Sequence, residues 1–323
     1  MQNTTHYNQR LKINELNNTT NLEEAIKNAE HLYISNLLGD EELLSSINSY
    51  LKKYNKKLWL SLNKSTEMNQ ENLKQLRYLT NVKKLKIIVF NGFIEDLSEL
   101  SHINDLEEFT IYDNVKKGIS LVPLAKFKNL SSLSLYTGLT IKQYAVLNTF
   151  EKLEHLSARE IDFSKLNNLP IKELTVDSKF IHSDLIAEKF PDIEYISLQN
   201  CKDVNIENIA SLPQLSDVRL RYMPHITRLT SFKNKENIFH LECVHLKNLE
   251  NIEAIFELKQ LKYLMITDLE KLKAEDFYRL KELPNLKVAY ITFKNAKEND
   301  KFITFANAHN WIYKQPSLAK TTL

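Results

Sequence analysis

Apolar residues recur along this chain in a fixed pattern, apolar-x-x-apolar-x-apolar. Ten copies are in register, and their first residues follow one another at intervals of 18 to 25 residues. The copies are Val82-Leu85-Ile87, Leu106-Phe109-Ile111, Leu130-Leu133-Leu135, Leu153-Leu156-Ala158, Ile171-Leu174-Val176, Ile193-Ile196-Leu198, Leu215-Val218-Leu220, Ile238-Leu241-Cys243, Leu261-Leu264-Ile266 and Leu286-Ala289-Ile291. Because alternate side chains of a strand point to opposite faces, each copy predicts a short strand with one buried face.

A second apolar group at helical spacing follows many of these strands and predicts short helices or 3₁₀ turns. Examples are Ile206-Ile209-Leu212, Ile226-Leu229-Phe232 and Ile252-Ile255-Leu258. Longer helices are predicted at 140–150, 182–190 and 273–283. Nearer the start of the chain, Leu32-Tyr33-Ile34 and Leu58-Trp59-Leu60-Ser61-Leu62 predict two more strands, with helical patterns at 40–54 and 69–79.

The repeating unit resembles the leucine-rich repeats of bacterial proteins, in the short class of about 22 residues that includes internalins. The resemblance implies a curved α/β solenoid, with a parallel β-sheet on its concave face and short helices or 3₁₀ turns on its convex face. We expect about 12 units over residues 29–294, the first two degenerate, because a solenoid core grows lengthwise. Residues 1–28 form an N-terminal cap in this interpretation. Residues 295–323 form a C-terminal cap, closed by Phe302, Phe305, Ala306 and Trp311, and a loose tail from Gln315.

The chain departs from this family at the position three residues after the third core residue, where the family usually has asparagine. Asn114 fits, and Cys201 is an acceptable substitute. The other units have Phe90, Gly138, Ile161, Lys179, Met223, Leu246, Leu269 and Lys294 there. Internalins also carry a secretion signal, which we do not find, so a surface adhesin is not the expected role.

Strand alternation predicts that positions 3, 5, 7 and 8 of each unit face the concave side. The fifth position has small hydroxylated residues in five successive units, namely Thr110, Ser134, Ser157, Thr175 and Ser197. Eight aromatic residues are also predicted there, namely Tyr33, Trp59, Tyr112, Tyr136, Tyr195, Tyr222, Tyr263 and Tyr290. The predicted charged residues are His155, Arg159, Glu160, Glu173, Asp177, Asp217, Arg219, Arg221, His240, Glu242 and His245.

Tyrosine, tryptophan and arginine dominate binding hot spots, so this face is the predicted site of partner binding. The candidate residues are Tyr112, Tyr136, Arg159, Tyr195, Arg219, Arg221, Tyr222, Glu242 and Tyr263. Two alternatives stay open: the aromatic residues pack only within the sheet, and the charges only pair with each other. Neighbouring strands lie about 4.8 Å apart, so Arg219 should stand beside Glu242, and Asp217 beside His240.

The charge balance argues against nucleic acid as the main partner. The chain has 43 Lys+Arg and 41 Asp+Glu, a net charge of +2, and both signs alternate throughout. No run of about 18 apolar residues predicts membrane insertion. The start of the chain has neither a basic nor an apolar signal segment, and two cysteines do not form a disulfide framework. We expect a cytoplasmic monomer, with secretion by a non-classical route left open.

No sequence motif supports catalysis, a metal site or a cofactor. The four glycines cannot form a GxGxxG turn or a P-loop, and CxxC, HExxH and EF-hand patterns are lacking. His155, His240 and His245 could converge, but no positioned nucleophile accompanies them. We therefore predict a non-enzymatic module that binds a protein on its concave face. The alternatives are a secreted or injected bacterial effector that acts on a host protein, and an immunity-type inhibitor of a cognate toxin.

Overall fold

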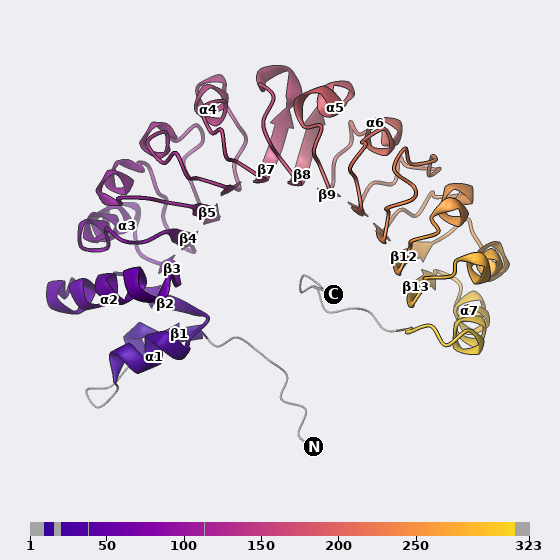
Figure 1. Ribbon diagram of the computed structural model, residues 1–323, viewed down its shortest axis with the longest axis horizontal. Helices are drawn as coiled ribbons and strands as arrows, with labels where there is room; N and C mark the ends of the chain where they lie inside the picture. Colours follow the sequence, from indigo (N-terminus) through magenta and orange to yellow (C-terminus); the bar gives the residue numbers. More distant parts are fainter. Residues whose placement is uncertain (1–9, 16–20, 38, 113, 314–323) are drawn as a thin grey trace. The chain divides into compact units, whose positions relative to one another are not determined.

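The computed structural model describes residues 10–15, 21–37, 39–112 and 114–313, which fall into two compact units. The first unit is Met1–Arg159 and the second is Glu160–Leu323. In each unit strands alternate with helices or 3₁₀ helices, and these helices lie on one side of the strands (Figure 1). The repeated parallel strands and covering helices are those of an α/β leucine-rich-repeat solenoid, which confirms the predicted fold class.

In the first unit each strand pairs in parallel with the next strand of the chain, and equal repeat positions stand opposite each other. Leu85, for example, lies between Leu58 and Phe109 of the neighbouring strands. The strands are β1 (Arg10–Lys12), β2 (His31–Ser35), β3 (Lys57–Leu62), β4 (Lys84–Val89), β5 (Glu108–Tyr112), β6 (Ser132–Leu135) and β7 (His155–Asp162), which runs across the boundary between the units. Strand β1 was not predicted, because its three residues fall within the expected N-terminal cap.

The helices of the first unit are capped as their sequences indicate. Helix α2 begins after Asp40, whose carboxylate accepts a hydrogen bond from the Leu43 amide at 3.0 Å, and ends at Asn55 in a left-handed conformation. The α-helices are α1 (Leu22–Asn28), α2 (Glu41–Tyr54), α3 (Thr66–Leu73) and α4 (Ile141–Leu147). The 3₁₀ helices are η1 (Ile13–Glu15), η2 (Lys74–Tyr78), η3 (Ser98–His102) and η4 (Val122–Leu124). The helical predictions at 40–54, 69–79 and 140–150 are confirmed.

The second unit repeats this arrangement with parallel, in-register strands. They are β8 (Glu173–Ile181), β9 (Tyr195–Gln199), β10 (Asp217–Arg221), β11 (His240–Val244), β12 (Tyr263–Leu269) and β13 (Val288–Phe293). Its helices are η5 (Phe163–Lys165), η6 (Ser183–Leu185), α5 (Ile186–Lys189), α6 (Ile206–Ala210), η7 (Glu253–Glu257), η8 (Ala274–Glu282) and α7 (Ala296–Ala308). All ten strands expected from the apolar pattern are therefore present.

One helical prediction is wrong. Ile226, Leu229 and Phe232 are buried as expected, but the segment around them forms turns and no helix. The amide of Leu229 donates to the carbonyl oxygen of Asn251 in the next repeat, at 3.0 Å, and Arg228 forms an isolated bridge with Asn251. Because the backbone bonds to the next repeat, it does not close a helical turn of its own.

The position that usually has asparagine is occupied in two chemically different ways. Asn114 donates to the carbonyl oxygens of Val89 and Phe90, each at 3.2 Å, as expected of a capping asparagine. The Cys201 thiol donates to the Val176 carbonyl oxygen at 3.6 Å, and burial raises the pKa of this thiol to about 12. Met223, Leu246 and Leu269 are buried at the same position in later repeats and extend the apolar core instead.

Aromatic side chains pack together at the end of the described chain. Helix α7 buries Phe302 and Ala306, and Trp311 is 8% exposed. Phe305 packs edge-on against Trp311, with the ring centroids 5.5 Å apart. The predicted tail from Gln315 lies outside the described residues.

We expect the strand alternation to be measurable at two adjacent residues of β9. Leu198 is fully buried, so Leu198→Ala should lower the free energy of unfolding by about 2–5 kcal/mol through the cavity it creates. Gln199 points to the opposite face, and Gln199→Ala should cost less than about 1 kcal/mol. Urea unfolding of both variants makes the comparison, and equal costs would contradict the assigned faces.

Candidate functional site

The face of the strands that the helices do not cover is called the open face here. Positions 3, 5 and 7 of each repeat lie on it, as Tyr195, Ser197 and Gln199 do in β9. In-register pairing places equal positions of neighbouring strands side by side, so these residues form rows across the strands. The content of each row therefore decides what this face can bind.

In the first unit, two of the predicted site residues meet directly. The rings of Tyr112 and Tyr136 pack with their centroids 4.1 Å apart. Thr110 and Ser134 stand opposite each other in the row of small hydroxylated residues. Arg159, the last residue of this unit, is exposed to solvent.

In the second unit, the predicted arginines are already paired within the face. Arg219 donates to Asp217 at 3.0 Å and lies over the ring of Tyr195, 5.0 Å from its centroid. Arg221 donates to Glu242 at 2.6 Å. The side chains of Arg219, Arg221 and Glu242 are 13%, 20% and 7% exposed, so these charges stiffen the face more than they offer free contacts.

The two predicted pairs of neighbours stand opposite each other on adjacent strands, but only one pair is in side-chain contact. Arg219 stands opposite Glu242 and Asp217 opposite His240, as expected. Asp217 accepts from His240 Nδ1 at 3.2 Å, which confirms that contact. Arg219, however, binds Asp217 two residues away on its own strand and leaves Glu242 to Arg221.

Asp217 is the centre of this buried polar network. Burial alone would raise the pKa of its carboxyl group, but hydrogen bonds from His240 and Arg219 hold that pKa below its ordinary value of 3.8. Beside it, the ring of His240 packs on Tyr263, with centroids 4.3 Å apart. Burial, with the charge of Glu242, raises the pKa of Tyr263 to about 12. Tyr263 is thus a packed neutral phenol and not an exposed anchor.

A groove of about 420 Å³ lies next to this network at the ends of β9 to β13. Its volume falls in the range of pockets that take a small ligand or a few partner side chains. Three predicted site residues, Arg221, Tyr222 and Glu242, line it. The other lining residues are Gln199, Val244, His245, Met265, Thr267, Asp268, Tyr290 and Thr292. We call this hollow the groove.

Position 8 of the repeat forms the rim of the groove and adopts an unusual backbone conformation. Tyr222, His245 and Asp268 have φ values of 56°, 54° and 61°, in the left-handed region. The Tyr222 and His245 rings stack 4.7 Å apart, and His245 Nδ1 lies 2.9 Å from the Asp268 carboxylate. A large ring in this conformation is strained, and such strain often marks a functional position.

Sequence reasoning missed part of the groove. The predicted residues did not include Met265, Thr267, Asp268 and Thr292. Asp268 occupies position 8, like Tyr222 and His245. Counting this position through every repeat would have found it. Tyr112, Tyr136 and Arg159 belong to the first unit, and Tyr195, Arg219 and Tyr263 do not line the groove.

Comparisons with known proteins give a fold resemblance and no family. No protein-family model and no curated protein matches the chain. Among solved structures, the chain is similar to a leucine-rich-repeat protein of Leptospira interrogans, with 16% sequence identity, a TM-score of 0.38 and 95% coverage of each chain.

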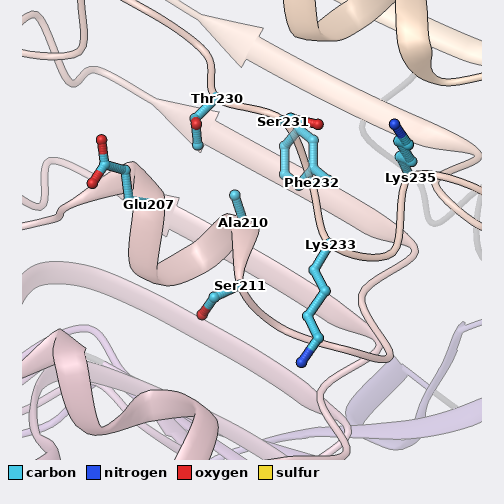
Figure 2. A pocket seen from close by; sticks show the side chains of 8 residues that line it. All are labelled: Glu207, Ala210, Ser211, Thr230, Ser231, Phe232, Lys233 and Lys235. Carbon is cyan, nitrogen blue, oxygen red and sulfur yellow. The ribbon is translucent and has the colours of Figure 1, made fainter.

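A second hollow, of about 540 Å³, lies beside α6 and the segment 230–235 (Figure 2). Lys233 and Lys235 point away from each other there. Ser231 and Lys235 both donate to Glu257, at 2.6 and 3.0 Å. Because these polar groups bind their own neighbours and do not converge, this hollow is a weaker candidate than the groove.

In the ranges 10–15, 21–37, 39–112 and 114–313, no cluster of three or more His, Cys, Asp or Glu side chains is placed to hold a metal ion. Over the same ranges, no helix is both long and apolar enough to cross a membrane.

The strain at Tyr222 predicts an unusual order of stabilities. Tyr222→Asn and Tyr222→Ala both remove the stacking on His245, but asparagine tolerates the left-handed conformation better than alanine does. We expect the Asn variant to be about 1 kcal/mol more stable than the Ala variant in urea unfolding. If the two variants are equally stable, position 222 is not strained.

The lowered pKa of Asp217 predicts acid sensitivity. A carboxyl group with a lowered folded-state pKa contributes stability above its ordinary pKa of 3.8 and loses it as the pH falls through the lowered value. Asp217→Asn should therefore be about 3 kcal/mol less stable at neutral pH and lose less further stability on acidification than the native chain. Unfolding at a series of pH values measures both effects. The exposed control Asp192→Asn should follow the native chain, and a native-like acid profile for Asp217→Asn would contradict the assignment.

Proposed function

We propose that this chain is a non-enzymatic binding module that holds a protein partner in the groove on the open face of its second unit. The observation that carries the proposal is Tyr222. Its side chain is 45% exposed at the rim of the groove, in a backbone conformation that costs stability. A strained and exposed aromatic residue is costly for a surface unless a partner covers it.

The surroundings of Tyr222 suit a protein partner. Arg221 and Glu242 hold each other at 2.6 Å in the groove and present fixed polar groups. Met265 and Tyr290 add apolar area. Aromatic and apolar contacts surrounded by oriented polar groups are typical of the centre of a protein–protein interface. Because the polar groups are paired before binding, the partner meets a surface that is already ordered.

Two more specific versions of this proposal are bacterial, in keeping with the resemblance of the repeats to the internalin class. An injected effector and an immunity-type inhibitor would both use the same face and would differ only in the protein they bind. Both versions therefore need the groove, and the experiment below tests this requirement before it identifies the partner.

The matched pair Tyr222→Asn and Tyr278→Asn tests the proposal. Tyr278 is 37% exposed but lies on η8, on the helical side of the same unit. Immobilised native chain and Tyr278→Asn should capture the same protein from the native cells, whereas Tyr222→Asn should lose about 2 kcal/mol of binding free energy or more. Mass spectrometry identifies the captured protein, and titration measures the loss.

The control for folding is built into the choice of residue, because asparagine suits the conformation at position 222. Circular dichroism should be unchanged in both variants. Undiminished capture by Tyr222→Asn would place the interface elsewhere on the chain.

A further inference from the structure

Basic side chains gather on the open face of the first unit, where the sequence did not single out a site. Arg10 of β1, Lys57 of β3, and Lys84 and Lys86 of β4 all lie at positions 3 or 5 of their repeats. The register places Arg10, His31, Lys57 and Lys84 in one row, and Trp59 beside Lys86 in the next. We call Arg10, Lys57, Lys84 and Lys86 the basic cluster.

Trp59 lies among the residues of the basic cluster and is half-buried. The Arg10 guanidinium lies 4.8 Å from a ring centroid of Trp59, and the Lys86 ammonium group lies 4.3 Å from it. His31 stacks on the same side chain, with centroids 4.0 Å apart and planes 19° from parallel. Neighbours on both flanking strands therefore hold the indole ring and the two cations in fixed positions.

The charges of the basic cluster are not balanced. Glu108 accepts from Lys57 at 2.8 Å and from Lys84 at 2.9 Å. Burial alone would raise the pKa of this carboxyl group, but these two hydrogen bonds hold it below its ordinary value. Over the described residues, no ion pair is formed by Arg10 or Lys86. Glu108 thus pairs with two of the four cations, and its single charge does not neutralise them.

Further features of the basic cluster favour an anionic ligand. Arg10 Nε, His31 Nε2 and Trp59 Nε1 are buried without a hydrogen-bond partner. Burial lowers the pKa of Lys86, and the charges of Lys57 and Arg10 lower it further. Buried donors are normally satisfied, so the unpartnered N–H groups of Arg10 and Trp59 are available to the acceptor atoms of a ligand.

We propose that the basic cluster binds an acidic segment of a protein partner, with carboxylates reaching Arg10 and Lys86 beside the Trp59 ring. Each cation is within 5 Å of the Trp59 ring, so their charges are at most about 9 Å apart. Carboxylates two residues apart on an extended segment are separated by about 7 Å. Such a segment fits both cations without moving the strands.

The same surface is poorly suited to nucleic acid. Single strands bind by stacking bases on open aromatic faces along a basic track. Here His31 and the two cations already pack on the Trp59 ring, so the ring is not open to stack on a base. The inference does not rest on the groove, because the basic cluster belongs to the other unit.

A labelled peptide of alternating Glu and Gly, titrated into the full chain, tests the inference by fluorescence anisotropy. Lys86→Gln should weaken binding about tenfold, because it removes a cation that forms no ion pair within the described residues. Glu108→Gln should strengthen binding several-fold, because it frees Lys57 and Lys84 for the peptide. The gain cannot result from misfolding. Lys142→Gln makes the same charge change on the exposed surface of α4 and should leave affinity unchanged, as should Tyr222→Asn in the groove.

Several outcomes would overturn the inference. They are equal binding of a matched Gln–Gly peptide, unchanged affinity of both the Lys86 and Glu108 variants, and tighter binding of an oligothymidylate than of the acidic peptide. Binding of the Glu–Gly peptide should also perturb the fluorescence of Trp59. The chain has two tryptophans, so a fluorescence change that persists in the Trp311→Phe variant comes from Trp59 in the basic cluster.

Discussion

The register of the parallel strands is the constraint on which the rest of the structure depends. Each strand pairs with the next so that equal repeat positions stand opposite each other, as Leu85 and Phe109 do. On the helical side this alignment stacks apolar rows into a core within each unit. On the open face the same alignment brings polar side chains together, about 4.8 Å from strand to strand. One periodicity thus produces both the stability and the surface chemistry.

The two units meet this constraint differently. In the second unit the rows contain both signs of charge, and Asp217, Arg219, Arg221 and Glu242 satisfy one another. Such a network gives the groove a defined shape, because these four charged side chains orient one another. In the first unit the rows are dominated by cations, and Glu108 balances only Lys57 and Lys84. An ordered surface and a charge-unbalanced surface are suited to different ligands.

The sequence predicted backbone placement better than side-chain pairing. Register follows from the apolar pattern, so strands β2 to β13 and the contact of Asp217 with His240 could be derived. The choice of Arg219 between Asp217 and Glu242 depends on rotamers and on local competition, which the pattern does not contain. The helix predicted at 226–232 was wrong for a related reason. The Leu229 amide donates to the Asn251 carbonyl oxygen of the next repeat, and the apolar spacing does not reveal this bond. The basic cluster was missed because β1 and its Arg10 lay outside the recognised repeat.

At position 8 the residue type does not always suit the backbone conformation. Asn36 and Asn200 occupy it with φ values of 50° and 54°, as suits asparagine in the left-handed region. Tyr222 and His245 adopt the same conformation at a greater cost and stack on each other at the rim of the groove. Folding alone would favour asparagine throughout, because it satisfies the same turn. A locally unfavourable residue at the exposed edge of the groove is what the proposed binding role would require.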